Sequence, residues 1–511
     1  SGFTYTSGTM TINAENVTVE NVTFGDGAIL TVNTSGKFTL KNCTFNGKSF
    51  VRTPVTLNVG SAEVTSNTFN GTQKNGTPSY YNAIEFAVSS GNKLAEAILS
   101  NNTFEAPIQN NYFSTYYYAD QAVITAENNV IKIANRESNA IRISNVTNSN
   151  VTFKLNNNSY EFSDASGSSE YEGFILLQDF SKSDAVQDFS KVTIEINGLT
   201  APADATRLFY VYDDQEGIIA KNQPIVKGDS SIEKFFVAKV DKTYYKTLAA
   251  AVAAAQDGAT ITLLKDTTES NIVLKKNGTL DLGGHTLDAG ATNRYGLRAA
   301  SGVDVTIQNG TVKNAFSALS IWGSNDSSKP TKVTVAQDVT FTDSGYGIIL
   351  AGYSTANDFK GKIGYAVLNF NGTITTGDNQ CPIFVMGNLG DNAESATAIG
   401  ENGNQINIGA TARITSKEEG IVLNGMAKLS VVDGATITGA DAITMKRGYL
   451  NITGGTFTGT GAKKVPTDAE HSGAEQSGSA ITVSSTYNYS GLIDVKISGG
   501  TFKSTNSYGF Y

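Results

Sequence analysis

A tetrapeptide pattern that recurs along the whole chain constrains the fold more than any other feature of the sequence. It consists of a polar or small residue, a small residue, threonine and an apolar residue, and it has twelve near-matches. Examples are NVTF at 21–24, NNTF at 101–104, and GGTF at both 454–457 and 499–502. A motif that returns every few tens of residues is typical of solenoids, in which each repeat forms one coil of the chain.

A second pattern, small–apolar–variable–apolar, alternates with the first. It includes AIEF at 83–86, AIRI at 140–143 and GIIL at 347–350, and in the later half successive segments begin 22, 29, 35, 38, 22 and 38 residues apart. A minimum near 22 residues fits one coil of three short strands, and the longer spacings fit loops that leave at the corners. We therefore predict an all-β fold, a right-handed parallel β-helix, in which strand alternation places Ile84 and Phe86 inward and Glu85 outward.

The alternative fold is a β-sandwich of short strands, which needs Asn-Gly or Asp-Gly hairpin turns between paired strands. Asn-Gly pairs occur at 309–310 and 371–372, but they lie inside the repeat at a fixed offset. Asparagine and glycine suit the corners of coils, because both tolerate left-handed backbone and asparagine side chains can form ladders. The pattern therefore favours the β-helix.

The repeat is interrupted at about 222–262, which predicts two consecutive β-helix domains, residues 1–225 and 235–511. The polar stretch 226–234 is predicted as a linker. TLAAAVAAAQ at 247–256 is predicted as a helix, because alanine is the best helix former and Thr247 suits the N-cap. The first coil of a solenoid exposes its core, so we expect this helix to cap the second domain. The alternative is one continuous solenoid, which would place the helix in the middle of the stack, where no end of the core is exposed for it to cap.

Composition excludes several classes of protein. The 38 basic and 47 acidic residues give a net charge of −9, with no basic block, so nucleic acid and membrane surfaces are poor partners. Two histidines and two cysteines cannot form a multi-histidine or Cys/His metal site. We expect no cofactor, with calcium at Asp213 and Asp214 as a weak alternative. Cys43 and Cys381 are expected to be buried thiols rather than a disulfide.

Three segments carry a resemblance to a known family: FVAKVDKTYYKTLAAAVAAAQDGATITLLKD at 236–266, LDLGGHTLDAG at 280–290 and VTIQNGTVKN at 305–314. They resemble the pectin-lyase-like right-handed parallel β-helix superfamily, and are most similar to β-helix modules of surface proteins from gut bacteria. The resemblance covers the later half well and the first half only by pattern. It implies a protein exported to the cell surface or beyond. It does not define an activity, because the superfamily contains lyases, hydrolases, tailspikes and non-catalytic adhesins.

The resemblance implies a groove lined by the outward residues of one sheet, as in the superfamily's enzymes. In the first half the predicted outward residues are Glu85, Ile124, Arg142, Ile175 and Tyr210. Aromatic residues, among them Tyr116 and Tyr117, are frequent in this half and suit sugar rings. We therefore predict a ligand site formed by Glu85, Asp120, Arg142, Tyr116, Tyr117, Tyr210 and Asp213. The alternative is an aromatic minicore with a solvated rim of charges.

In the later half the outward positions hold no carboxylate. These positions are Arg298, Ser320, Ile349, Phe384, Val422, Thr444 and Thr482, and two residues further on Ala300, Trp322, Ala351, Met386, Asn424, Lys446 and Ser484. Trp322, Ile349, Phe384 and Met386 form a predicted apolar stripe, with Trp322 and Phe384 as ligand contacts. The alternative is that loops at 357–365 and 387–407 cover the stripe. His285 is predicted as a corner residue rather than a catalytic one.

These observations lead to two functional hypotheses. The first is an extracellular, non-catalytic adhesin or glycan-binding module that acts as a monomer on a polysaccharide or a surface glycan. The alternative is a polysaccharide lyase or glycoside hydrolase with its site in the first domain, which requires converging carboxylates or calcium with a basic residue. Because Ser1 is not an initiator methionine and no leader follows it, we expect the export signal and anchor to lie outside this chain.

Overall fold

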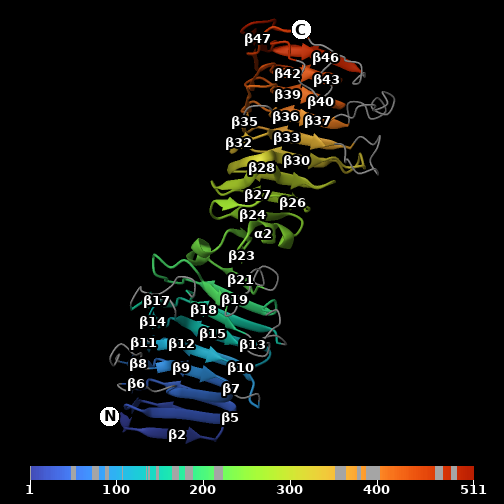
Figure 1. Cartoon of the computed structure of the whole chain (residues 1–511). Coiled ribbons are helices and arrows are strands. Elements are labelled where there is room, and N and C mark those ends of the chain that lie inside the picture. Colours follow the sequence, from blue (N-terminus) through green and yellow to red (C-terminus); the bar gives the residue numbers. More distant parts are fainter. Residues whose placement is uncertain are drawn as a thin grey trace. The chain divides into compact units, whose positions relative to one another are not determined.

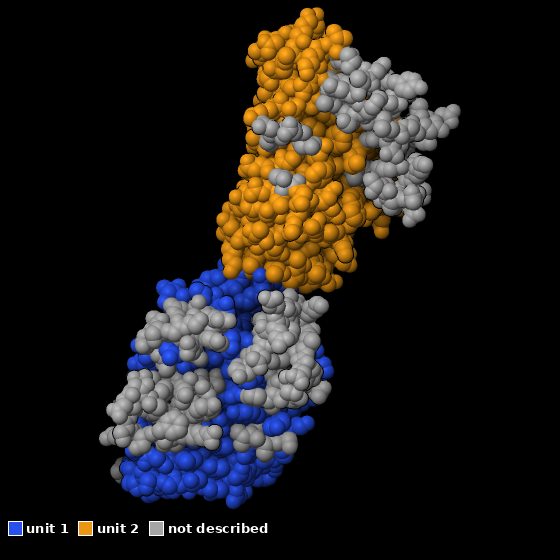
Figure 2. All heavy atoms as spheres, viewed as in Figure 1, with its two compact units in different colours: residues 1–236, 242–246 blue, residues 237–241, 247–511 orange. Residues whose placement is uncertain are grey.

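A computed structural model shows coils of short strands stacked as successive rungs (Figure 1). The described residues are 2–47, 53–71, 80–86, 91–105, 108–133, 135, 138–144, 149–163, 172–178, 188–211, 223–351, 364–376, 381–386, 403–465, 476–484 and 492–511. They form two compact units, drawn in blue and orange in Figure 2. The first unit comprises residues 1–236 and 242–246, and the second comprises residues 237–241 and 247–511.

The first unit is a parallel β-helix with three strand ladders. The first ladder contains β1 (Phe3–Tyr5), β4 (Val22–Phe24), β6 (Thr44–Gly47), β8 (Thr68–Gly71), β11 (Thr103–Phe104), β14 (Val130–Ile133) and β17 (Ser159–Phe162). The second contains β3 (Val17–Glu20), β5 (Ala28–Lys41), β7 (Val55–Thr65), β10 (Leu94–Ser100), β13 (Tyr118–Glu127), β16 (Val151–Asn156), β19 (Val192–Asn197) and β21 (Ile225–Gly228). The third contains β2 (Gly8–Ile12), the first halves of β5 and β7, β9 (Tyr80–Phe86), β12 (Ile108–Thr115), β15 (Asn139–Ser144), β18 (Ile175–Gln178) and β20 (Phe209–Val211).

Asparagines shape one corner of these coils. Asn101, Asn128 and Asn157 take left-handed backbone with φ between 51° and 56°, a conformation that asparagine tolerates better than most residues. The residue after each of them is a buried asparagine. In this column the Asn102 Nδ2 donates to the carbonyl of Val64 at 2.9 Å and to Asn129 Oδ1 at 3.0 Å. The column therefore satisfies the polar groups that the turn buries, one rung after another.

Stacked aromatic rings fill the core of the same coils. The rings of Phe24, Phe45, Phe69 and Phe104 stack in sequence, with centroids 4.5, 4.8 and 4.8 Å apart. All four side chains are almost completely buried. The phenylalanine of the tetrapeptide pattern is thus the residue that each coil packs on the next.

The second unit repeats the plan with its own three ladders. The first contains β24 (Ala259–Leu263), β27 (Gly278–Asp281), β29 (Asp304–Gln308), β31 (Thr331–Val335), β34 (Ala366–Phe370), β37 (Asn404–Ile408), β40 (Ala427–Val431), β43 (Gly448–Ile452) and β46 (Ile493–Ile497). The second contains β25 (Thr267–Thr268), β28 (Thr286–Ala299), β30 (Gly310–Trp322), β32 (Val339–Ser344), β35 (Thr373–Thr376), β38 (Arg413–Thr415), β41 (Thr436–Gly439), β44 (Thr456–Gly459) and β47 (Thr501–Ser504). The third contains β26 (Ile272–Leu274), the second halves of β28 and β30, β33 (Tyr346–Ala351), β36 (Ile383–Val385), β39 (Ile421–Leu423), β42 (Ile443–Met445) and β45 (Ile481–Val483).

The predicted helix is present as α2 (Leu248–Ala254), and it covers the start of the second unit. Thr247 is the N-cap, and its side chain accepts a hydrogen bond from the backbone N–H of Ala250. The Glu269 carboxylate accepts from the N–H groups of Leu248 and Ala249 at 2.7 and 2.9 Å. The helix contacts β22 (Ala238–Val240), β24 and β26, so it shields the first coil of this unit.

The linker predicted at 226–234 is wrong, because these residues are folded parts of the first unit. They contribute to β21 and to the short 3₁₀ helix η1 (Ser230–Phe235), which Asp229 caps. Val226 and Ile232 are buried, although their polar neighbours make the stretch resemble a linker. The segment that follows is shared between the units. β23 (Thr243–Tyr245) pairs antiparallel with β21 of the first unit, and β22 pairs antiparallel with β24 of the second.

Candidate functional site

The ladder from β9 to β20 in the first unit carries a row of outward side chains. Register places Glu85 beside Ser114, Ser114 beside Arg142, Arg142 beside Leu176 and Leu176 beside Tyr210. Because neighbouring parallel strands are about 4.8 Å apart, each step along this row is one such spacing. We call these five residues the Glu85 row.

Five polar side chains are connected by hydrogen bonds along the Glu85 row and its flank. The Tyr116 hydroxyl lies 3.4 Å from Glu85 Oε1 and 3.5 Å from Arg142 Nη1, so it bridges the carboxylate and the guanidinium through two long hydrogen bonds. The Arg142 Cζ is 5.3 Å from the centre of the Tyr116 ring. Arg142 Nη2 donates to Gln178 Oε1 at 2.9 Å, and Asn82 Nδ2 donates to Glu85 Oε1 at 2.5 Å.

Exposure divides this cluster into an outer and an inner part. Glu85 and Tyr116 are half-buried, whereas Arg142 and Gln178 are each 8% exposed. Glu85 and Tyr116 can therefore contact a ligand, while the buried Arg142 donates a hydrogen bond to the Tyr116 hydroxyl. A carboxylate, a phenol and a guanidinium can donate and accept hydrogen bonds to sugar hydroxyls, and the phenol ring can contact a sugar face.

The structure brings together some of the residues predicted for this site. Glu85, Tyr116 and Arg142 lie in one hydrogen-bonded cluster, and Tyr210 is in the same row two strands beyond Arg142. Asp120 is elsewhere: it belongs to β13, in the second ladder, where Asn150 donates to its carboxylate from the backbone and the side chain, both at 3.0 Å. The Asn150 backbone hydrogen bond is the main cause of the lowered pKa of Asp120.

Tyr117 is half-buried between β12 and β13, next to Tyr116 but in no interaction with the cluster among the described residues. Asp213 lies outside the described residues. Two outward assignments in the row are wrong. Ile124 is buried on β13, and Ser114 on β12 takes its place, because β12 does not repeat the small–apolar pattern. Ile175 points inward, and its neighbour Leu176 is the outward residue.

The apolar stripe predicted in the second unit is not continuous. Trp322 is 43% exposed and Phe384 is half-buried, but Ile349 between them is 4% exposed. Four half-buried aromatic rings, Tyr295, Phe316, Tyr346 and Phe384, follow one another with centroids 5.3–5.4 Å apart. Tyr295, Phe316 and Tyr346 lie in β28, β30 and β33, but one or two residues before the small–apolar segments that begin at 296, 318 and 347. The search for outward positions within those segments therefore missed them.

Further along this ladder the outward positions are buried and polar. Asn424, Thr444 and Lys446 are at most 1% exposed, and Arg447 is fully buried with its Nε donating to the carbonyl of Asn424 at 2.7 Å. Asp441 accepts from the backbone N–H groups of Ser477 and Ser479 and from the Thr482 hydroxyl. These contacts bind the segment around 477–482 to the preceding coil.

Glu419 is a buried acid in the same region. Its side chain is 5% exposed, and its Oε1 has no hydrogen-bond partner among the described residues. Burial raises the pKa of Glu419 to about 7, and the nearby charges of Glu418 and Asp441 act in the same direction. The thiol of Cys381 also has a pKa well above its usual value, because it is buried and close to Glu419. Cys43 and Cys381 are both buried and free, as expected.

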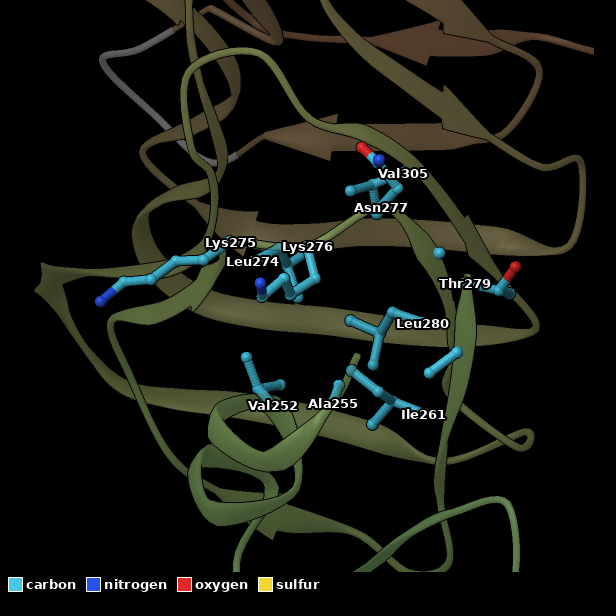
Figure 3. A pocket seen from close by; sticks show the side chains of 12 residues that line it. Val252, Ala255, Ile261, Leu274, Lys275, Lys276, Asn277, Thr279, Leu280 and Val305 are labelled. Carbon is cyan, nitrogen blue, oxygen red and sulfur yellow. The ribbon is translucent and has the colours of Figure 1, made fainter. Parts of the chain in front are cut away.

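A hollow lies beside the cap helix α2 (Figure 3). Its lining includes the apolar side chains of Val252, Ala255, Ile261, Leu274 and Leu280, and the Lys275 side chain extends away from them. A ligand pocket needs a few polar groups that converge on one point, and this lining does not provide them. We interpret the hollow as incomplete packing between the cap and the first coils.

Two further observations concern metal and membrane. Among the residues that the structure describes, no group of three His, Cys, Asp or Glu side chains could hold a metal ion. Asp213 and Asp214 lie outside those residues. Within the same residues, no helix combines the length and the hydropathy needed to cross a bilayer.

Comparisons with known proteins add little to this description. No protein-family model matches the chain, and no curated protein matches it in sequence. Among solved structures, that of a variant of AlyGC, a PL6 family alginate lyase, is similar at 10% sequence identity with a TM-score of 0.26. The similarity covers 98% of this chain and 96% of that chain. The parallel register of the strands, rather than this similarity, defines the chain as an all-β parallel β-helix protein.

Proposed function

We propose that the chain is an extracellular polysaccharide-binding β-helix protein whose first unit holds the saccharide over the Glu85 row. The observation that carries the proposal is the connected cluster of Glu85, Tyr116, Arg142 and Gln178 on the outward face of a parallel ladder. A parallel β-helix repeats its outward positions at one strand spacing, which suits an extended polymer with repeating hydroxyl groups. The net charge of −9 and the absence of a basic block speak against nucleic acid as the ligand.

A lyase is the second candidate, and the position of the Tyr116 hydroxyl supports it. This hydroxyl lies between a carboxylate and a guanidinium, where a phenol can transfer a proton. In the elimination, the carbon next to a uronate carboxylate loses a proton and the C4–O bond breaks. A double bond forms between C4 and C5, and the departing oxygen takes up a proton. A glycoside hydrolase needs two carboxylic groups, and Glu85 is the one carboxylate that the described residues place in this cluster.

Substitution of Tyr116 by phenylalanine separates binding from cleavage. Binding and product formation are measured on one panel of neutral and uronate polysaccharides, with calorimetry for affinity and ultraviolet absorbance for the unsaturated product. If the protein only binds, wild type forms no product, and Tyr116→Phe weakens binding by a few fold, as expected for one lost hydrogen bond. If it is a lyase, wild type forms product and Tyr116→Phe abolishes it while binding persists.

Tyr117→Phe is the matched control, because Tyr117 is the adjacent tyrosine and is not part of the cluster. It should leave both affinity and product formation unchanged. Arg142→Lys tests the supporting role of the guanidinium, because lysine keeps the charge but loses the paired contacts to Tyr116 and Gln178. Absence of binding to every polysaccharide in the panel would overturn the proposed function.

A further inference from the structure

Arg298, in the second unit, is a cation held by aromatic rings instead of by a carboxylate. It lies on the outward side of β28, where its Cζ is 3.8 Å from the centre of the Tyr295 ring and 5.8 Å from that of Trp322. It forms no ion pair with a described carboxylate, and its buried Nε has no hydrogen-bond partner among the described residues. An arginine fixed by rings keeps the donors of its guanidinium available for an anion.

Two further side chains on the same face complete a basic aromatic patch. Trp322 lies one strand from Arg298, on β30, and is 43% exposed. Lys275 directly follows β26, the strand on the other side of β28, and alternation gives it the same outward direction as Arg298. Lys275 is exposed and has no ion pair among the described residues. We call Lys275, Tyr295, Arg298 and Trp322 the Arg298 patch.

The geometry points to the Arg298 patch as a second saccharide site, one that takes a carboxylated sugar. A planar guanidinium matches a carboxylate through two parallel hydrogen bonds, and the Lys275 ammonium adds a second positive charge. The exposed ring of Trp322 provides a flat apolar surface for the C–H face of a sugar ring. A uronic acid residue carries both complementary features. The site is in the second unit, so it does not depend on the function proposed for the Glu85 row.

The patch can be observed selectively, because Trp322 is the one tryptophan of the chain. Tryptophan emission of the full-length protein therefore reports on this site and not on the first unit. Titration with oligogalacturonate is expected to change the intensity or wavelength of this emission in a saturable way. A neutral xylo-oligosaccharide of the same length is expected to bind at least about tenfold more weakly, since it lacks the carboxylates that form charge-assisted hydrogen bonds.

Three variants assign the effect to Arg298. Arg298→Gln removes the charge and is expected to weaken oligogalacturonate binding roughly tenfold or more, whereas Arg298→Lys keeps the charge and should give an intermediate affinity. Arg413→Gln is the matched control, because Arg413 is an exposed arginine of the same unit whose Nη1 donates to backbone carbonyls. Circular dichroism confirms folding of each variant, and calorimetry repeats the titration without using Trp322.

Any one of the following results would overturn the assignment: no saturable emission change with oligogalacturonate, equal binding of the neutral oligosaccharide, or full affinity in a folded Arg298→Gln variant. Equal or tighter binding of a carboxylate-free sulfated oligosaccharide would also overturn it, because the charge alone would then be recognised. Loss of polysaccharide binding in Tyr116→Phe with normal Trp322 titration would leave this site intact. The two proposals therefore fail independently.

Discussion

At the scale of single residues, the asparagine column shows how a polar side chain can act as core. Asn67, Asn102, Asn129 and Asn158 are at most 3% exposed, and each Nδ2 donates to a backbone carbonyl on the preceding coil at 2.8–3.0 Å. Each buried amide thus replaces water for the turns on both sides. The first member of the column is Cys43, whose Sγ lies 3.7 Å from the carbonyl of Val19, in the direction that the amides take.

Substitution of Asn102 by leucine should destabilise the first unit by about 2–3 kcal/mol. The change removes the acceptor for the Asn67 N–H and Nδ2 and the donor to the Val64 carbonyl, and unpaired buried polar groups carry this cost. Urea unfolding followed by circular dichroism measures the effect. Asn101→Gly is the control and should change stability little, because Asn101 has φ = 56° and glycine adopts that backbone freely. A cost below about 0.5 kcal/mol for Asn102→Leu would contradict the role of the column.

Glu419 should make the stability of the second unit depend on pH. Its pKa is about 7 in the folded chain, above its usual value of 4.5, so the folded state binds the proton more tightly than the unfolded state. Stability is therefore highest below about pH 4.5, falls as the pH rises, and reaches its low value above pH 7. The size of this loss is at most about 3 kcal/mol.

The Glu419→Gln variant isolates this contribution. It should unfold at a higher temperature than wild type above pH 7, and the difference should shrink towards pH 4.5. Thermal unfolding at a series of pH values measures it. Glu161→Gln serves as the control, because Glu161 has an exposed side chain. Parallel pH profiles for wild type and Glu419→Gln would show that Glu419 is not the group that titrates.

At the scale of elements, the cap helix α2 depends on a carboxylate from the chain that follows it. Replacement of Glu269 by alanine should lower the stability of the second unit by about 1 kcal/mol, because the N–H groups of Leu248 and Ala249 lose their acceptors and the helix dipole loses a favourable charge. Glu269→Gln keeps one acceptor oxygen and should lose less. Denaturant unfolding compares the variants. Equal stability of wild type and Glu269→Ala would mean that the Glu269 carboxylate does not stabilise the start of α2.

Local patterns predicted the elements whose residues act within their own coil. The tetrapeptide pattern predicted the repeated short strands, such as β6 and β8, and the alanine run predicted α2. The patterns failed where the deciding contact comes from another coil. Ser114 entered the Glu85 row because β12 pairs with β9 and β15, and Ile232 is buried within a polar stretch.

For the candidate sites, the sequence predicted outward strand positions but not the side chains that contact them. Alternation identified Glu85, Arg142 and Arg298 as outward residues, and the structure connects the first two through Tyr116. It did not identify Tyr295 as the ring beneath Arg298, because Tyr295 precedes the outward position by three residues and contacts Arg298 through its side chain. Nor did it predict that Lys446 is fully buried, since burial depends on chain that is distant in sequence.

At the scale of the whole molecule, the two units share a short stretch of chain. Residues 237–241 belong to the second unit and residues 242–246 to the first, so a cut on either side removes a strand from one of them. We predict that the overlapping fragments 1–246 and 237–511 each fold independently, because each keeps its own core and its antiparallel strand. Fragment 247–511, which lacks β22, should unfold at a lower temperature than fragment 237–511. Thermal unfolding of the three fragments tests this, and failure of both overlapping fragments to fold would show that the units need one another.

The stacked rungs also determine how a chain of this kind can change its length. In the second unit Gly420 and Ala442 occupy equivalent positions 22 residues apart, and both β36 and β42 pair with β39. Loss of all of residues 420–441 would bring Ile443 beside Ile383 and restore an apolar contact of the same kind. Loss of a single strand residue would instead turn every later side chain of that strand to the opposite face. Viable insertions and deletions are therefore expected as whole coils, or as changes within the corner loops, so such proteins evolve in length by discrete steps.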